Sequence, residues 1–356
     1  MTGRSSLLSV RDLSVTFPGG RTRPAARPVG GLSFDLRAGE ILALAGESGA
    51  GKSLTARALV GMAPPDARVT GSVRIHDAEV LPGTGGPAGR KAFAGLWGRR
   101  ISLIPQDSLS VLSPVHPVGD QLAAAARSVN RLGRRAARAA AVAALDRVGI
   151  ADAARRARAY PHEFSGGMRQ RAVIAMATVN EPDLVVADEP TTALDPESQD
   201  QVLGVLGSLR ETSGTALLLI SHDLPAVRRH ADRVLVLYAG RLVESGPVGT
   251  VLSRPRAPYT AGLLASLPPD EPVTDRRLPV IHGAPPSPEE LATLTGCAFA
   301  ARCPLTDARC RSHTPEPAAV AGTAGHDDPA HHVVACHRHQ DVPATARDLF
   351  REESSA

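Results

Sequence analysis

Lysine is nearly absent from this chain of 356 residues, since only Lys52 and Lys91 are lysines and arginine supplies the other basic residues. Aromatic residues are also scarce, at 3% of the sequence. The formal net charge of +4 is small for this length, so charge alone does not indicate binding to nucleic acid. Hydrophobic residues make up 43%, which allows a core of ordinary size and excludes disorder and collagen-like or coiled-coil structure. The length predicts a large domain and a smaller one.

Long apolar runs and early cysteines are missing as well. The longest apolar segments, such as Thr215–Ile220 and Val234–Tyr238, are far shorter than the roughly 20 residues of a membrane-spanning helix. Residues 1–9 lack the apolar centre of a signal peptide, so we expect a protein that is not secreted. All four cysteines lie beyond position 296, an arrangement that excludes a secreted disulfide scaffold. The cysteines are therefore expected to serve a local purpose.

Hydrophobic patterning predicts alternating strands and helices. Ile41–Ala45 and Leu184–Ala187 are continuous apolar runs, as in strands buried within a parallel sheet. Leu7–Phe17 alternates apolar and polar residues, which is typical of a strand with one exposed face. Residues 118–159 are rich in alanine and arginine at helical spacing and predict a helical insert. Together these features favour an α/β fold with a mostly parallel sheet.

Residues 46–53 match the phosphate-loop pattern G-x-x-x-x-G-K-[ST], between a predicted strand and a helix predicted to start near Lys52. Glycines let backbone N–H groups converge on phosphate oxygens, and the helix directs its positive N-terminal end at the same anion. Lys52 would reach the β- and γ-phosphates of a nucleotide, and the Ser53 hydroxyl would bind Mg²⁺. The sequence therefore predicts a site for a nucleoside triphosphate, formed by Gly46, Glu47, Ser48, Gly49, Ala50, Gly51, Lys52 and Ser53.

Two acidic residues follow the buried strand predicted at 184–187. In α/β sheets, ligands bind at the carboxyl ends of the strands, which is where Asp188 and Glu189 stand. Asp188 would hold Mg²⁺ through water, and Glu189 would polarise the attacking water as a general base. The competing interpretation is that the two carboxylates are only the solvated end of a strand. Their position behind a phosphate loop favours the catalytic interpretation.

Three motifs make the chain resemble the ATP-binding subunits of ABC transporters over residues 7–250. They are Phe164–Arg171 (FSGGMRQR), Asp188–Asp195 (DEPTTALD) and Ser221–Asp223 (SHD), in the order and spacing of that family. The resemblance implies a phosphate-loop NTPase cassette. Its expected parts are a mostly parallel sheet, an antiparallel β part and a helical subdomain at about 107–178.

The first of these motifs resembles the family's signature. Ser165 is expected to cap a helix, and its hydroxyl with the amides of Gly166 and Gly167 would form an anion-binding end. In this family that end faces the γ-phosphate bound by a partner subunit, so the resemblance implies that hydrolysis requires a dimer. Asp195 would make a contact across the same dimer. An ordinary helix cap is the competing interpretation for the Ser-Gly-Gly sequence.

Three single residues also match positions of the family. Gln106 matches the glutamine of the loop that senses Mg²⁺ and water and couples to the permease, so it is a predicted Mg²⁺ ligand. His222 matches the switch histidine, which would contact the γ-phosphate and orient Glu189 and water. Phe17 fits the aromatic residue that stacks on adenine, with a phenylalanine buried in a strand as the rival interpretation.

The segment beyond residue 250 resembles the C-terminal extension of peptide-type importers through Pro258-Tyr259-Thr260 and the leucines and proline that follow. Four thiols without paired C-x2-C knuckles are compatible with an iron–sulfur cluster or with zinc. The resemblance favours a [4Fe–4S] cluster, four nearby histidines favour zinc, and free buried thiols are the third interpretation. The cysteines are Cys297, Cys303, Cys310 and Cys336, and the histidines are His331, His332, His337 and His339.

We therefore expect residues 1–250 to form an ABC ATP-binding domain, 251–340 a C-terminal module with the four cysteines, and 341–356 a flexible tail. The predicted function is ATP hydrolysis, with ATP and Mg²⁺, that energises uptake of peptides or nickel at the cytoplasmic face of the cell membrane. The expected partners are a second ATP-binding subunit in a heterodimer, two membrane permeases and an external substrate-binding protein, without nucleic acid. The competing function is that of a soluble ABC-type ATPase acting on nucleic acid or ribosomes.

Overall fold

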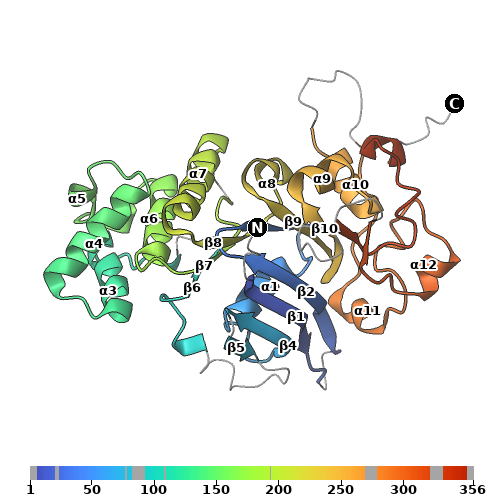
Figure 1. The fold of residues 1–356 in the computed structure, drawn as a ribbon, viewed down its shortest axis with the longest axis horizontal. Helices are drawn as coiled ribbons and strands as arrows, with labels where there is room; N and C mark the ends of the chain where they lie inside the picture. Colours follow the sequence, from blue (N-terminus) through green and yellow to red (C-terminus); the bar gives the residue numbers. More distant parts are fainter. Residues whose placement is uncertain are drawn as a thin grey trace.

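The structure, a computed structural model, describes residues 6–20, 24–76, 78–81, 93–107, 110–192, 194–268, 279–320 and 332–350. An eight-stranded sheet runs through the middle of the molecule, with a four-stranded antiparallel sheet below it in the view of Figure 1. A helical lobe, drawn in green, lies at one end, and the C-terminal segment, in orange and red, lies at the other. The predicted combination of a mostly parallel sheet, an antiparallel part and a helical subdomain is confirmed.

The eight-stranded sheet has the order β11-β12-β10-β9-β3-β8-β7-β6. Its neighbours from β9 to β6 pair in parallel, and the remaining pairs are antiparallel. Every residue of β3, β7, β8 and β9 is buried, as expected of strands that are covered on both faces. The strands are β3 (Ile41–Ala45), β6 (Ile101–Ile104), β7 (Leu184–Asp188), β8 (Ala216–Ser221), β9 (Arg233–Tyr238), β10 (Arg241–Pro247), β11 (Ala318–Ala319) and β12 (Val333–Val334).

Two hydrophobic cores lie on opposite faces of this sheet. Alternate residues of a strand point to opposite faces. Ala43 and Ala187 accordingly belong to the core shared with the helical lobe, whereas Leu44 and Val186 belong to the core shared with the antiparallel sheet and α1 (Lys52–Leu59). The helix that follows the phosphate loop is therefore fixed by burial against the central sheet.

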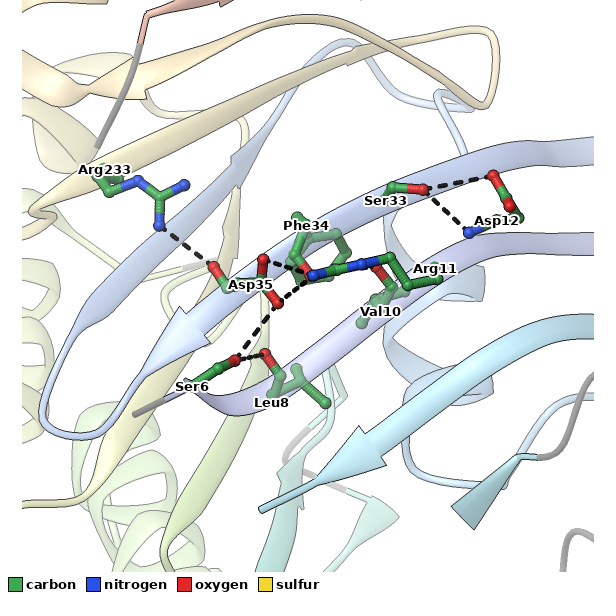
Figure 2. Close-up of polar contacts among 9 residues, drawn as sticks. All are labelled: Ser6, Leu8, Val10, Arg11, Asp12, Ser33, Phe34, Asp35 and Arg233. Atoms are coloured by element: carbon green, nitrogen blue, oxygen red, sulfur yellow. Dashed lines mark hydrogen bonds and ion pairs between the residues drawn. The ribbon is translucent and has the colours of Figure 1, made fainter. Parts of the chain in front are cut away.

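The antiparallel sheet has the order β2-β1-β4-β5 and is tied together by polar contacts as well as by its core (Figure 2). Arg11 donates two hydrogen bonds of 2.9 Å to the Asp35 carboxylate on the neighbouring strand. Arg233 of β9 donates to the carbonyl oxygen of Asp35 (3.2 Å) and to the Glu40 carboxylate (2.9 Å), which connects the two sheets. The strands are β1 (Ser6–Phe17), β2 (Ala26–Arg37), β4 (Arg68–Ile75) and β5 (Ala78–Leu81).

The alanine- and arginine-rich segment forms the helical lobe, in agreement with its pattern. Leu122 and Leu145 are fully buried where its helices pack together. Two further helices, α7 and α8, cover the same face of the central sheet next to the lobe. The helices are α3 (Val118–Asn130), α4 (Arg134–Arg147), α5 (Ala153–Arg156), η2 (Pro161–Glu163), α6 (Gly166–Thr178), α7 (Pro196–Ser213) and α8 (Leu224–His230).

The C-terminal segment is fastened to the central sheet by Glu244 of β10, whose side chain is completely buried. The Glu244 carboxylate accepts hydrogen bonds from the backbone N–H groups of Arg256 (2.6 Å) and Ala257 (3.0 Å) and lies 2.7 Å from His332 Nε2. One buried carboxylate therefore holds two separate parts of the segment. Its helices are α9 (Val248–Ser253), α10 (Pro258–Ala265), α11 (Pro288–Thr293), α12 (Ala308–Ser312) and η3 (Ala346–Leu349).

Residues 341–350, at the start of the predicted tail, pack back onto this segment. Arg347 of η3 donates a 3.3 Å hydrogen bond to Leu267 O, just beyond α10. Residues 351–356 lie outside the described part of the chain. Within the described ranges, no helix combines the length and the apolar composition that a bilayer crossing needs.

Candidate functional site

The phosphate loop connects β3 to α1, as predicted. Gly46, Gly49 and Gly51 have positive φ angles of 147°, 82° and 89°, which residues with side chains rarely adopt. A Cβ on Gly51 would lie 2.6 Å from Pro28 O, and a Cβ on Gly46 would collide with a backbone carbonyl of β9. The loop is therefore shaped both by its own dihedral angles and by close backbone neighbours, and it requires glycine at these positions.

Lys52 is the first residue of α1, and its side chain is 4% exposed. Its Nζ donates hydrogen bonds to Gly46 O (2.8 Å) and Glu47 O (2.9 Å) and lies 3.9 Å from Glu189 Oε1. Burial lowers the pKa of Lys52, and the neighbouring carboxylates act in the opposite direction. The ammonium group thus lies over the loop, where phosphate oxygens could replace the two carbonyl oxygens as its partners.

Ser53 and Asp188 connect the phosphate loop to the end of β7. Ser53 Oγ donates a 2.7 Å hydrogen bond to Asp188 Oδ1. Burial raises the pKa of Asp188, while the hydrogen bond from Ser53 lowers it. A hydroxyl and a carboxylate are the hard oxygen donors that Mg²⁺ prefers, and they lie beside the cationic loop. The two side chains therefore fit a Mg²⁺ ion that is shared with a bound phosphate.

Glu189 is the residue on which the predicted catalytic side chains converge. Its Oε2 accepts hydrogen bonds from Gln106 Nε2 (3.1 Å) and Thr192 Oγ1 (3.0 Å), and His222 Nδ1 lies 3.3 Å from the same oxygen. Its Oε1 faces Lys52. The φ angle of Glu189 is 47°, a strained value for a residue with a side chain. Backbone strain at the end of a parallel strand thus aims this carboxylate at the phosphate loop.

The signature residues Ser165, Gly166 and Gly167 lie at the start of α6, in the helical lobe (Figure 1). Ser165 Oγ accepts a 3.3 Å hydrogen bond from the backbone of the first helical turn. Asp195 caps α7 and accepts hydrogen bonds from Ser198 N (3.0 Å) and Ser198 Oγ (2.7 Å), which lower its pKa. Within one chain both side chains are helix caps. Their contacts across a dimer stay predictions.

Phe17 is the last residue of β1 and pairs with Ala26 of β2. Its side chain is half-buried and packs against the core beneath the antiparallel sheet. Stacking of Phe17 on adenine stays a prediction.

Two family models match this chain. Residues 29–192 match the ABC transporter model, and residues 243–310 match the model of the oligopeptide/dipeptide transporter, C-terminal region. The dipeptide transport ATP-binding protein DppD of Bacillus subtilis is 42% identical over 301 residues, which are 84% of this chain and 87% of that protein. The chain belongs to the ATP-binding proteins of the ABC transporter family. The family resemblance indicated by the motifs is confirmed.

Other relatives of this ABC protein differ in length or in sequence. The oligopeptide transport ATP-binding protein OppD of Mycobacterium bovis is 46% identical over 355 residues, which are 99% of this chain but 55% of that protein. The chain therefore spans about half the length of this relative. The ATP-binding cassette MJ0796, solved as a dimer bound to ADP and Pi, superposes with a TM-score of 0.58 at 22% identity. That superposition covers 68% of this chain and 98% of the cassette, and it shows the shared fold.

The four cysteines of this ABC protein are free thiols and surround one cavity of the C-terminal segment. Burial raises the pKa of all four thiols, to about 11 for Cys303 and about 12 for Cys336. A metal ion that bound here would have to displace the thiol protons, because metals bind thiolates. In the part of the chain that the structure describes, no three cysteine, histidine, aspartate or glutamate side chains are placed to hold a metal ion. The predicted iron–sulfur cluster or zinc ion therefore has no support in this arrangement and stays a prediction.

The histidines that favoured zinc have other contacts. His332 is buried against Glu244. His337 Nε2 lies 3.0 Å from His313 O, and His339 Nδ1 lies 3.1 Å from a backbone carbonyl. His331 lies outside the described residues. His332 thus connects the C-terminal segment to β10, His337 connects two parts of that segment, and His339 makes a contact within one turn.

Sequence patterns missed three residues that touch the site. Thr192 donates a hydrogen bond to Glu189. The motif that contains Thr192 was recognised, but no role was predicted for this residue. Tyr259 and Arg302 come from the C-terminal segment and contact Glu47 of the phosphate loop. Tyr259 lies within the Pro-Tyr-Thr motif, and Arg302 immediately precedes Cys303, so both lie in or beside features that the sequence analysis names. No local pattern connects them to the phosphate loop.

Proposed function

We propose that this ABC protein hydrolyses ATP and thereby energises the uptake of peptides through a membrane transporter. The observation that carries the proposal is the convergence on Glu189 of Lys52, Gln106 and His222, next to the Ser53–Asp188 pair. These groups come from four separate segments of the chain and meet at the carboxyl ends of parallel strands. Such an arrangement supplies cations, Mg²⁺ ligands and a general base in one place.

Each group has a definite part in the proposed reaction. The amides of residues 46–51 and the Lys52 ammonium bind the β- and γ-phosphates, and Ser53 and Asp188 hold Mg²⁺. Bound Mg²⁺ neutralises charge that develops on the phosphates. Glu189 accepts a proton from the attacking water, while Gln106 and His222 orient the Glu189 carboxylate through its Oε2 atom.

The proposed assembly places two ATP-binding subunits face to face. The start of α6, with Ser165, Gly166 and Gly167, would close on the γ-phosphate bound by the other subunit, and Asp195 would lie in the same interface. The match of residues 243–310 to the oligopeptide/dipeptide transporter model supports peptides as the proposed cargo, and nickel stays the alternative. We propose a heterodimer at the cytoplasmic face of the membrane, bound to two permeases that receive peptide from an external binding protein.

The test is to isolate the full chain from detergent-solubilised membranes and to measure both its companions and its ATP turnover. We expect two permeases and a related ATP-binding subunit, with ATP hydrolysis that rises when binding protein loaded with a short peptide is added. A rise with Ni²⁺-loaded binding protein, and none with peptide, would replace the proposed cargo. Recovery from the soluble fraction with nucleic acid or ribosomes would contradict the transport function.

A further inference from the structure

The second residue of the phosphate loop is held from outside the ATP-binding cassette. The Glu47 carboxylate accepts two hydrogen bonds from the Arg302 guanidinium, 2.8 Å from Nη1 to Oε2 and 3.2 Å from Nη2 to Oε1. The backbone N–H of Glu47 donates a 2.9 Å hydrogen bond to the Tyr259 hydroxyl. These partners are separated from Glu47 by 255 and 212 positions in the sequence. The C-terminal segment therefore contacts the loop at both its side chain and its backbone.

Arg302 is itself rigidly placed. Its side chain is 7% exposed, and each of its three nitrogens has a partner. Nε donates to His282 O (3.0 Å), Nη1 also contacts the Tyr238 hydroxyl (3.3 Å), and Nη2 also donates to Ile281 O (3.3 Å). The guanidinium carbon lies 5.7 Å from the centre of the Tyr238 ring and 5.9 Å from that of Phe299. A planar donor held in this way fixes the direction of the carboxylate that it binds.

The charge of Glu47 gives this contact a consequence for ATP. A carboxylate within the phosphate loop lies close to the triphosphate and repels it, unless a cation neutralises the carboxylate. Arg302 supplies that cation in a buried position, where solvent screens the pair little. Lys52 contacts the carbonyl oxygen of Glu47 and is committed to the phosphates, so it does not take the place of Arg302.

We propose that Arg302 is a positioning residue of the phosphate loop, which it orients and neutralises through Glu47. The C-terminal segment thereby sets the nucleotide affinity of the cassette, with Tyr259 as a second point of attachment. The part of this inference that concerns ATP rests on the proposed function, whereas the part that concerns loop geometry does not. Two measurements on the full chain separate these parts.

The first measurement is hydrogen exchange of the nucleotide-free protein. In Arg302→Gln, we expect the amides of residues 46–51 to exchange faster than in the unchanged protein, because the loop has lost its side-chain anchor. Arg11→Gln is the matched control, since Arg11 also binds a carboxylate through two hydrogen bonds but lies in the antiparallel sheet. Equal exchange of residues 46–51 in Arg302→Gln and in the unchanged protein would overturn the positioning role, whether or not the chain binds ATP.

The second measurement is the equilibrium affinity for Mg·ATP. We expect Arg302→Gln to bind about tenfold more weakly, because it leaves the Glu47 charge unpaired beside the phosphates. Adding Glu47→Gln removes that charge, so the double variant should regain most of the loss, and Arg302→Lys should fall between. If Arg302 had a purely structural role, the loss of affinity in Arg302→Gln and that in the single variant Glu47→Gln would add in the double variant. Additive losses would overturn the neutralising role, and an unchanged protein that binds no Mg·ATP would overturn the proposed function alone.

Discussion

The nucleotide site and the cysteine-lined cavity are both clusters of titratable side chains, but only the nucleotide site combines side chains of opposite charge. At the nucleotide site, Lys52, Asp188 and Glu189 form contacts among cations, anions and hydrogen-bond donors. Burial is the largest influence on the pKa of Lys52 and of Asp188, and likewise on that of every thiol, but around the cavity four thiols face one space and no such set of opposite charges is formed among them. The first cluster presents opposite charges to an ionic ligand, whereas the second presents four thiols to a cavity. Charge complementarity therefore indicates the class of ligand at the first cluster, and clustering alone does not do so at the second.

The largest expected effect tests the reactive half of this comparison. Glu189→Gln should lower the turnover number for ATP about 10²–10⁴-fold, because the amide cannot accept the proton of the attacking water. Binding of Mg·ATP should persist, as measured by equilibrium titration alongside steady-state hydrolysis. Glu197→Gln on α7 is the control, since Glu197 lies in the first turn of that helix and contacts a neighbouring glutamine. Turnover close to normal in Glu189→Gln would show that another group activates the water.

The next effect concerns the stability of the C-terminal segment. Glu244→Ala should lower the free energy of unfolding by about 3–5 kcal/mol, because two backbone N–H groups and His332 lose a buried acceptor. Urea denaturation followed by circular dichroism measures this change. Glu316→Ala, at an exposed position of the same segment, should change the stability little. Equal stability of the two variants would mean that Glu244 does not hold the segment to the sheet.

A smaller effect has opposite signs at two aspartates. Burial raises the folded-state pKa of Asp188, so its proton stabilises the fold in acid, and this stabilisation disappears as pH rises through the folded pKa. Asp188→Asn should therefore raise the melting temperature at pH 7 by about 2–4 °C, and this gain should vanish in acid. The same variant should abolish hydrolysis, because it removes the carboxylate that is proposed to hold Mg²⁺. Hydrogen bonds lower the pKa of Asp195, so Asp195→Asn should lose stability at pH 7 and not in acid. Melting curves between pH 4 and pH 8 measure both changes, and shifts of the same sign would contradict the opposite pKa directions of the two aspartates.

The smallest expected effect lies outside both regions. Arg11→Gln should cost about 0.2–1 kcal/mol of folding free energy, because the Arg11 side chain is 52% exposed and water screens its pair with Asp35. Chemical denaturation measures the difference. A loss as large as that of Glu244→Ala would show that the antiparallel sheet depends on this ion pair more than on its apolar core.

Sequence patterns predicted the features that depend on local order. The bounds of β3 agree with the structure and those of β7 differ by one residue, because continuous apolar runs identify buried strands. β4 was missed because only two of its eight residues are buried, so its pairing with β1 decides its structure, and β5 was missed because its four residues are too few for a pattern. Helix α8 was missed because its seven residues are too few for a clear helical period.

Long-range contacts were beyond reach of the sequence alone. The motif at residues 46–53 predicted the phosphate loop, but not that Arg302 would bind its second residue, since 255 positions separate the two. The spacing of the cysteines predicted that they come together, and the cavity confirms this. Whether the sulfurs are placed as ligands depends on side-chain burial and direction, which spacing does not determine. The metal therefore stays a prediction, whereas the structure does place the four thiols around one cavity.

Trp97 gives the molecule an optical property that follows from one hydrogen bond. Its indole Nε1 donates a 2.8 Å hydrogen bond to Val60 O, the residue at the C-terminal end of α1. The other end of α1 is Lys52, so a single short helix runs from the phosphate loop to the indole. The chain has one tryptophan and three tyrosines, which leaves the emission spectrum nearly free of other sources. Intrinsic fluorescence of the unlabelled protein would therefore report any displacement of α1 that accompanies nucleotide binding to the phosphate loop.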